Sequence, residues 1–145
     1  MERINEFRGE YSFLSNFYRS PVEIGGLKYS CVECAFQAQK CINPKDKLQF
    51  TTIGPVAAKK LGRSIDLRSD WEDIKVSIMW ECLIDKFTRY DFLKRKLLDT
   101  GDAYLQEGNT WGDKFWGVDL RSGKGDNKLG QLLMSVRDVL RNGDN

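Results

Sequence analysis

The stretch Val32-Glu33-Cys34-Ala35-Phe36-Gln37-Ala38-Gln39-Lys40-Cys41-Ile42 decides the fold, because the chain changes there from an extended to a helical pattern. Cys34, Ala38 and Cys41 recur at the i, i+4, i+7 spacing of one helix face. The stretch ends before Asn43-Pro44, and a residue that precedes proline is pushed out of the helical region. We therefore expect a helix over residues 32–42.

The residues before this helix predict a β-hairpin. Val22-Glu23-Ile24 and Leu27-Lys28-Tyr29 alternate apolar and polar side chains around Gly25-Gly26, a pair that can adopt the positive φ of a tight turn. We expect the whole N-terminal third of the chain to be extended.

The residues after the helix predict four more helices, at about 55–62, 70–87, 91–99 and 129–140. Ser69 and Glu72 have capping-box spacing before the longest of them, and Asp126 or Asn127 is the expected cap of the last. The fold class is therefore α+β, mostly helical, with a small antiparallel sheet. With 145 residues and no repeat or linker, the chain is expected to be a single domain over 1–145.

Composition excludes several classes of function. Lys and Arg outnumber Asp and Glu by only 23 to 21, too balanced for a protein that binds mainly by neutralising many phosphates. The sequence has no histidine, which removes Ser-His-Asp catalysis, Cys-His catalysis and His-ligated zinc. Catalysis must then use carboxylates, lysine, arginine, tyrosine, cysteine or amides.

The four cysteines and the N-terminus favour a cytoplasmic protein without a cofactor. Cys31 and Cys34 have zinc-knuckle spacing, but Cys41 and Cys82 do not make the second close pair that such a site needs. We expect reduced thiols and no metal. No apolar stretch is long enough to span a membrane, and the first residues lack the apolar core of a signal peptide.

One polar stripe on the helix at 32–42 is a candidate site. Glu33, Gln37 and Lys40 fall on one side of it, flanked by Phe36. The simpler interpretation is a solvated face with a weak ion pair. The alternative is a catalytic carboxylate whose ionisation is held by a neighbouring lysine.

Two further segments combine aromatic, acidic and glycine residues. Residues 111–119 alternate tryptophan, which can stack on a base, with aspartate, which can move a proton. Residues 122–130 form a glycine-rich turn before a helix, where an anion is favoured, although Lys124 is followed by Gly125 rather than the Ser or Thr of a Walker A loop. Taken alone, core tryptophans beside surface aspartates explain the first segment better, and ordinary helix capping explains the second.

Several short motifs, taken in order, resemble the NADAR family over nearly the whole chain. They are Phe13-Leu14-Ser15-Asn16-Phe17, residues 32–40, Leu61-Gly62-Arg63, Asp70-Trp71, Lys86-Phe87, Thr100-Gly101, residues 113–117 and residues 125–134. That family includes an N-glycosidase of riboflavin-biosynthesis intermediates and members that remove ADP-ribose from guanine in nucleic acid. The resemblance implies its compact, largely helical α+β fold.

The resemblance also implies roles for individual residues. Glu33 matches the catalytic glutamate, with Lys40 and Asp113 expected to manage the proton of the leaving base or, for Lys40, to attack the sugar as an amine. Cys34 stands where relatives often have histidine; the helix projection turns it away from Glu33, so this change should affect packing. The expected substrate-binding residues are Ser15, Asn16, Phe17, Arg63, Trp71, Trp116, Gly125 and Asn127.

The predicted function is hydrolysis of the N-glycosidic bond between ribose and a base or amine in a phosphorylated ribosyl or ADP-ribosyl substrate. The substrate would be a small nucleotide or an ADP-ribosylated nucleic acid. Two alternatives are a non-catalytic module that binds ADP-ribose or NAD, and a nucleic-acid-binding domain that uses Lys94-Arg95-Lys96. The near-neutral net charge disfavours the last.

Overall fold

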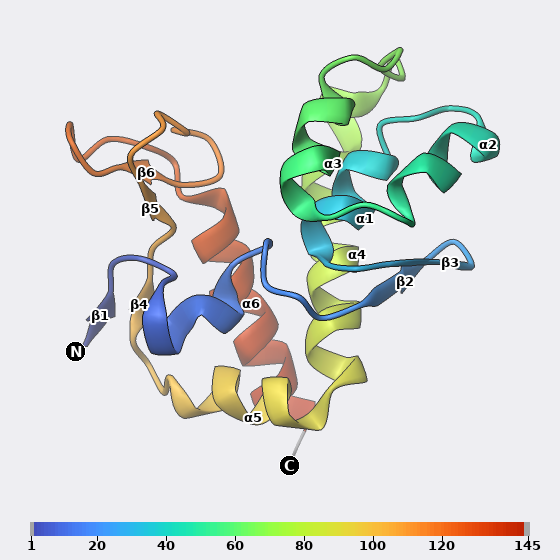
Figure 1. Ribbon diagram of the computed structural model, residues 1–145. Coiled ribbons are helices and arrows are strands. Elements are labelled where there is room, and N and C mark those ends of the chain that lie inside the picture. The colour runs from blue at the N-terminus through green and yellow to red at the C-terminus, as the bar shows by residue number, and fades with distance from the viewer. Residues whose placement is uncertain (1, 144–145) are drawn as a thin grey trace. The chain divides into compact units, whose positions relative to one another are not determined.

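The computed structural model describes residues 2–143 (Figure 1). The chain divides into two compact units. The central unit is Asn16–Arg89, and the terminal unit consists of the described residues up to Ser15 and from Tyr90 onward. The single domain expected over residues 1–145 stays a prediction.

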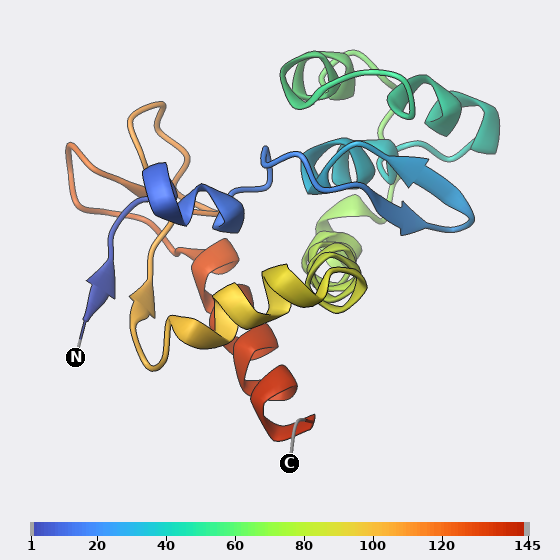
Figure 2. The same cartoon turned by 60° about the horizontal axis from the view of Figure 1, so that its bottom comes forward.

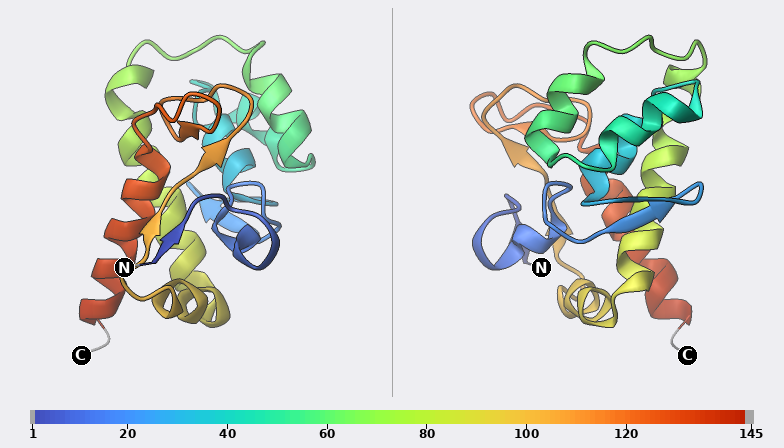
Figure 3. Two further views of the ribbon diagram at one scale, coloured as in Figure 1. Left: turned by 90° about the vertical axis from the view of Figure 1, so that its left-hand side faces the viewer. Right: turned by 45° about the vertical axis from the view of Figure 1, so that its right-hand side comes forward.

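The central unit contains the predicted hairpin. Strand β2, Val22–Ile24, pairs antiparallel with β3, Leu27–Tyr29. The turn glycines, Gly25 and Gly26, have φ of 59° and 84°, the region that favours glycine. The hairpin lies beside helix α1, Val32–Ala38, and packs on α4, Trp71–Arg89 (Figure 3).

Helix α1 is shorter than the predicted range. It ends at Ala38, because the next residues, from Gln39 to Cys41, donate their N–H groups to carbonyls three residues back, a tighter turn than the α-helix. All seven of its residues are buried. The predicted apolar face made by Cys34, Ala38 and Cys41 is confirmed, with each of these side chains buried.

Short helices complete the central unit around α1. Helix α3, Pro55–Gly62, has the predicted bounds and packs on α1. Helix α2, Pro44–Lys47, and the 3-10 helix η2, Leu48–Phe50, were not predicted. Proline at the first position of α2 explains how the motif expected to stop a helix also begins one.

Helix α4 begins one residue later than predicted. Ile74 donates its N–H to the carbonyl of Asp70, which makes Asp70 rather than Ser69 the cap position. The Asp70 carboxylate is held by Arg68, at 2.7 Å. The buried residues of α4 are Trp71, Met79, Cys82, Leu83, Lys86 and Phe87.

The terminal unit is built from two helices and two pairs of short strands. Helix α5, Asp91–Asp99, has the predicted bounds and lies across α6, Lys128–Gly143 (Figure 2). Strand β1, Arg3–Ile4, pairs with β4, Tyr104–Leu105, and the two lie side by side in Figure 3. Strand β5, Gly108–Asn109, pairs with β6, Val118–Asp119.

The mostly helical α+β class is confirmed, with two differences of detail. Both strand pairs of the terminal unit are parallel and add to the predicted antiparallel hairpin. The N-terminal third is not wholly extended, because residues Gly9–Leu14 form the 3-10 helix η1. Phe13 and Leu14 are buried by that turn.

Candidate active site

The centre of the candidate site is Glu33, in the first turn of α1. Its backbone N–H donates to the carbonyl of Asn16 at 3.0 Å, which fixes the start of the helix. Its side chain is buried, with 9% of the residue exposed. Gln37, one helical turn later, donates from Nε2 to Oε2 of Glu33 at 2.7 Å. A carboxylate is thus hydrogen-bonded and oriented inside the central unit.

This burial decides between the two interpretations of the polar stripe. Only 6% of Gln37 is exposed, and Lys40 is half-buried. A solvated helix face is therefore wrong for these residues. Glutamate is rarely buried unless it is paired or functional.

Lys40 faces the same environment. Burial lowers the pKa of Lys40 below its ordinary value, while the charge of Glu33 opposes this and the cations Arg63, Lys59 and Lys75 add to it. Lys40 can therefore lose its proton more readily than an exposed lysine. Lys40 therefore interacts with the Glu33 carboxylate and with three further cations.

Two aromatic rings flank these charged groups. Phe36 of α1 and Trp71 of α4 pack with ring centroids 5.0 Å apart, and Trp71 is buried. The Lys40 Nζ lies 5.9 Å from the centroid of the Trp71 ring. The structure therefore places Trp71 beside both Phe36 and Lys40.

Asn16 and Phe17 lie at the start of the central unit. The Asn16 side chain is buried, donates to Sδ of Met79 at 3.5 Å, and has an Oδ1 without a hydrogen-bond partner in the described residues. The Lys59 Nζ is 6.0 Å from the Phe17 ring centroid. Asn16 thus keeps an acceptor unused close to the backbone of Glu33.

Cys34 packs on a different side of α1 from Glu33. Its sulfur lies 3.3 Å from the carbonyl oxygen of Ile53, 3.4 Å from Ser30 Oγ and 3.6 Å from the sulfur of Cys31. The sulfur contact lowers the pKa of Cys31 to about 7 and raises that of Cys34. These contacts support a packing role for Cys34.

In the terminal unit, Asp113 holds its own loop. Its Oδ1 accepts from the N–H groups of Phe115 and Trp116, at 3.1 and 3.0 Å. Asn109 bonds both the N–H and the carbonyl of Asp113. Trp116 is half-buried, with its ring edge-on to Phe115 at 4.9 Å between centroids.

Asn127, at the start of α6, uses its side chain to bond residues outside the helix. It has a positive φ of 52°, its Oδ1 accepts from the N–H of Glu107, and its Nδ2 donates to the Leu105 carbonyl and the Tyr104 hydroxyl. Its carbonyl accepts the first helical bond of α6, from the N–H of Gln131 at 2.9 Å, so Asn127 occupies one of the two expected cap positions. Its side chain bonds residues outside the helix instead of the N–H groups of the first turn.

The glycine-rich turn uses several of its backbone N–H groups within the protein. Gly125 has a φ of 151°, and a Cβ there would lie 2.2 Å from the carbonyl oxygen of Gly117. Close packing therefore explains the glycine. Five backbone N–H groups of this turn donate to protein carbonyls. The donors are Gly123, Asp126, Asn127, Lys128 and Leu129.

The predicted residues thus fall into two groups. Asn16, Phe17, Glu33, Lys40, Arg63 and Trp71 belong to the central unit, and Ser15, Asp113, Trp116, Gly125 and Asn127 to the terminal unit. Ser15 follows η1 and donates its N–H to the carbonyl of Ser12.

The sequence placed Gln37 on the polar stripe beside Glu33 without giving it a role of its own, and Lys59 and Lys75 were not among the predicted site residues. The spacing of four residues between Glu33 and Gln37 could have indicated their contact, since side chains at i and i+4 meet on a helix. The two lysines carried no such signal, because they come from other helices.

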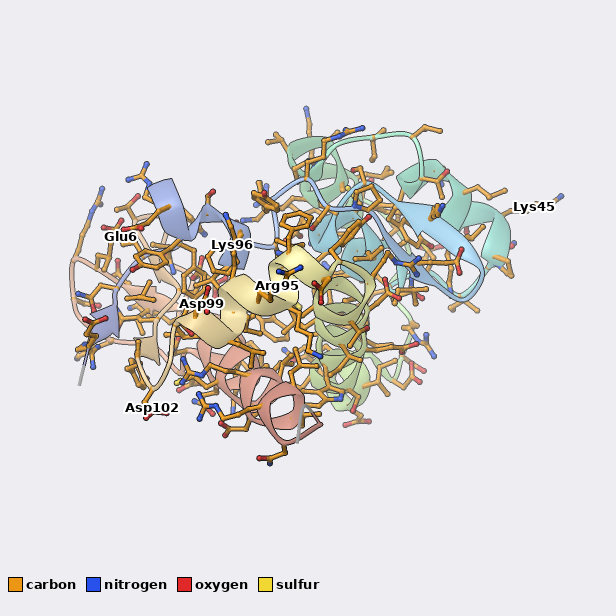
Figure 4. All side chains as sticks on the ribbon, turned by 90° about the horizontal axis from the view of Figure 1, so that it is seen from below. Glu6, Lys45, Arg95, Lys96, Asp99 and Asp102 are labelled. Carbon is orange, nitrogen blue, oxygen red and sulfur yellow. The ribbon has the colours of Figure 1, made fainter. Side chains whose placement is uncertain are left out.

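The basic run on α5 does not form one common patch. Arg95 pairs with Asp91, and Lys96 lies 5.3 Å from the Phe13 ring, beside η1 in Figure 4. Among residues 2–143, no group of three or more acidic or cysteine side chains is placed to hold a metal ion. Within the same range, no helix is long and apolar enough to cross a membrane.

Comparison with known proteins identifies the family. The model of the NADAR domain matches residues 4–141. The N-glycosidase YbiA of Escherichia coli is 37% identical over 134 residues, covering 90% of this chain and 82% of that protein. An N-glycosidase of Nostoc punctiforme is 38% identical over 138 residues, with 91% and 87% covered.

A solved structure and a longer relative support the same family assignment. The NMR structure of Escherichia coli YbiA superposes with a TM-score of 0.87 at 34% identity, covering 99% of this chain and 89% of that one. A riboflavin biosynthesis protein of Vibrio vulnificus is 35% identical over 134 residues, which is 90% of this chain but 36% of that protein. The chain therefore belongs to the NADAR family, as an enzyme of the N-glycosidase class.

Proposed function

We propose that the chain hydrolyses the bond between C1′ of ribose and a base or amine nitrogen, in a substrate that carries phosphate as a ribosyl phosphate or as ADP-ribose. The observation that carries this proposal is the buried Glu33 carboxylate, which accepts a hydrogen bond from Gln37 at 2.7 Å and interacts with the charge of Lys40.

Glu33 is the proposed catalytic carboxylate. Breaking a ribosyl C–N bond builds positive charge on the sugar, and a fixed carboxylate in a water-poor site stabilises that charge. The same oxygen atoms can take a proton from the attacking water. Its hydroxyl then bonds to C1′ while the base leaves with the electron pair of the broken bond.

Lys40 and Asp113 are the two candidates for the proton that the leaving nitrogen needs. Lys40 has a lowered pKa and lies in the same electrostatic environment as Glu33, which supports it as the acid. Asp113 keeps a second carboxylate oxygen beside the one that holds its loop. The proton-transfer roles of Lys40 and Asp113 are proposed for this chain on these grounds and on its resemblance to the family.

The positive charges near Lys40 support a phosphorylated substrate. Lys59 is half-buried on α3, and Arg63, which directly follows α3, is exposed. Side-chain cations are the proposed phosphate ligands, because five N–H groups of the glycine-rich turn already donate to protein carbonyls. Stacking of the base on an aromatic ring such as Trp71 or Trp116 is worth about 1–3 kcal/mol.

Two sources of such a substrate fit the relatives. The Vibrio vulnificus protein is named for riboflavin biosynthesis, which points to ribosylaminopyrimidine phosphates. The family resemblance adds ADP-ribosylated guanine in nucleic acid. Both share ribose, phosphate and a nitrogen leaving group, and a cytoplasmic location would give access to both.

The experiment is product analysis by chromatography with mass detection. The purified protein and its Glu33→Gln variant are incubated with ribosylaminopyrimidine phosphates, ADP-ribosylated guanine in DNA, ADP-ribosyl-arginine and NAD. We expect only the wild type to form products from one of the first two substrates. Ribosylaminopyrimidine phosphates would give a free base and a sugar phosphate, whereas ADP-ribosylated DNA would give free ADP-ribose and unmodified guanine that stays in the DNA. Equal turnover by the folded Glu33→Gln variant would refute the catalytic role of Glu33.

A further inference from the structure

Gly62, the last residue of α3, occupies a position where the backbone does not require glycine. Its φ lies outside the positive range, and the residue is buried against α1. A Cβ placed there would lie 2.0 Å from Oε1 of Gln37 and 2.9 Å from its Cδ. The side chain of Gln37 is therefore what excludes every larger residue at position 62.

The Gln37 amide is held in one orientation. Its Nε2 donates to Glu33 Oε2 at 2.7 Å, whereas its Oε1 is buried without a hydrogen-bond partner in the described residues. Rotating the amide would bring Oε1 against the carboxylate, which repels it. An acceptor is thus left unused so that the donor can meet Glu33.

Gln39 shows how differently a buried glutamine behaves when it serves packing alone. Its Nε2 donates to the Ala35 carbonyl at 3.0 Å, and its Oε1 accepts from Lys47 at 3.3 Å. Both ends of that amide are used, as is usual for buried polar groups. Gln37 departs from this rule on the side that faces Gly62.

We infer that Gly62 is a positioning residue for the reaction, acting through Gln37 on the carboxylate of Glu33. Gly62 leaves room for the amide, the amide donates to Glu33, and this bond keeps the carboxylate ionised and oriented toward the sugar. The inference rests on the proposed catalytic role of Glu33. It assigns to α3 a part in catalysis besides packing.

A double-mutant cycle tests this chain of contacts. Gly62→Ala should lower kcat about tenfold or more with little change in KM, because it displaces the Gln37 amide. Gln37→Ala should cause a similar loss. In the Gln37→Ala background the Gly62→Ala change should have no further effect, since the Gln37 Cβ lies 3.5 Å from the added Cβ, an ordinary contact.

The pH profile separates positioning from general damage. A carboxylate that loses a hydrogen-bond donor takes up a proton at higher pH, so the acidic limb of kcat/KM should move up by about one pH unit in both single variants. Gly143→Ala is the matched control, because Gly143 ends α6 with nothing within 4 Å of a new Cβ. It should keep the wild-type rate and profile.

Each outcome decides the inference. Losses that multiply in the double variant, or an acidic limb that stays in place, would overturn it. If Gly62→Ala fails to fold, Gly62→Ala/Gln37→Ala is compared with Gln37→Ala: equal rates support the inference and a further loss refutes it. Activity retained by Glu33→Gln would instead remove the proposed function, independently of this cycle.

Discussion

At the scale of single residues, Lys40 decides how the leaving base receives its proton. A protonated lysine acts as an acid below its pKa, and burial lowers the pKa of Lys40. We expect kcat to fall on the alkaline side at a pH below the ordinary lysine value of 10.5. Lys40→Arg should shift that fall to higher pH, and Lys40→Met should lose about 10²-fold or more in kcat.

The sign of this pH effect separates two mechanisms. A lysine that attacks the sugar as a free amine is active above its pKa, so kcat would rise with pH and Lys40→Arg would be inactive. Steady-state rates of the three proteins between pH 6 and 10 distinguish the two. A rising wild-type profile would replace acid catalysis by covalent attack.

Asp113 combines a structural bond with its proposed catalytic role, and one substitution separates them. Asparagine keeps an oxygen that can accept from the N–H groups of Phe115 and Trp116, but it cannot move a proton. We expect Asp113→Asn to unfold within a few degrees of the wild type and to lose about 10²-fold in kcat. An active, stable Asp113→Asn protein would restrict Asp113 to holding its loop.

Among the elements, α1 shows what sequence can and cannot establish. The apolar spacing of Cys34, Ala38 and Cys41 correctly predicted the helix. It also predicted that Glu33 and Gln37 lie on a second stripe of that helix. The pattern could not show that this second stripe is also buried, because burial there depends on the helices that pack around it. Polar residues at a functional site break the usual link between polarity and exposure.

The short strands illustrate a different limit. The hairpin was predictable because two adjacent segments and a glycine turn carry the whole signal. The pair β1–β4 joins Arg3 to Tyr104, and a strand of two residues has too few side chains to show alternation. Such pairings depend on tertiary contacts, which local patterns do not encode.

The start of α6 offers a prediction about the side chain that joins it to β4 and to the segment that follows β4. Asn127 bonds Leu105, Glu107 and Tyr104 and holds a φ of 52°. Asn127→Ala loses the bonds and strains the backbone, so we expect a destabilisation of about 2–4 kcal/mol in urea unfolding.

Asn127→Gly removes the same bonds without the strain. It should be about 1 kcal/mol more stable than Asn127→Ala, because glycine accepts positive φ. Asn43→Ala, which removes a single exposed cap bond on α2, is the control and should cost about 1 kcal/mol. Equal stability of all three variants would mean that the Asn127 bonds contribute nothing beyond an ordinary cap.

At the scale of the whole molecule, Lys86 makes stability depend on pH. Lys86 is fully buried on α4, and its Nζ lies 5.5 Å from the centroid of the Tyr18 ring and 5.1 Å from that of the Phe87 ring. Burial lowers the pKa of Lys86 to about 7, and the charge of Cys31 opposes this shift. Between this value and 10.5 the unfolded chain binds a proton that the folded chain has released. The free energy of unfolding should therefore rise with pH by about 1.4 kcal/mol per unit from this residue, and the contribution should be flat below pH 7, where both states are protonated.

Urea unfolding of the wild type and Lys86→Met at pH 6, 7, 8 and 9 isolates the contribution of Lys86, since groups such as Cys31 titrate in both proteins. The difference between the two curves should be constant from pH 6 to 7 and then grow, whereas parallel curves throughout would show that Lys86 stays charged inside the folded protein.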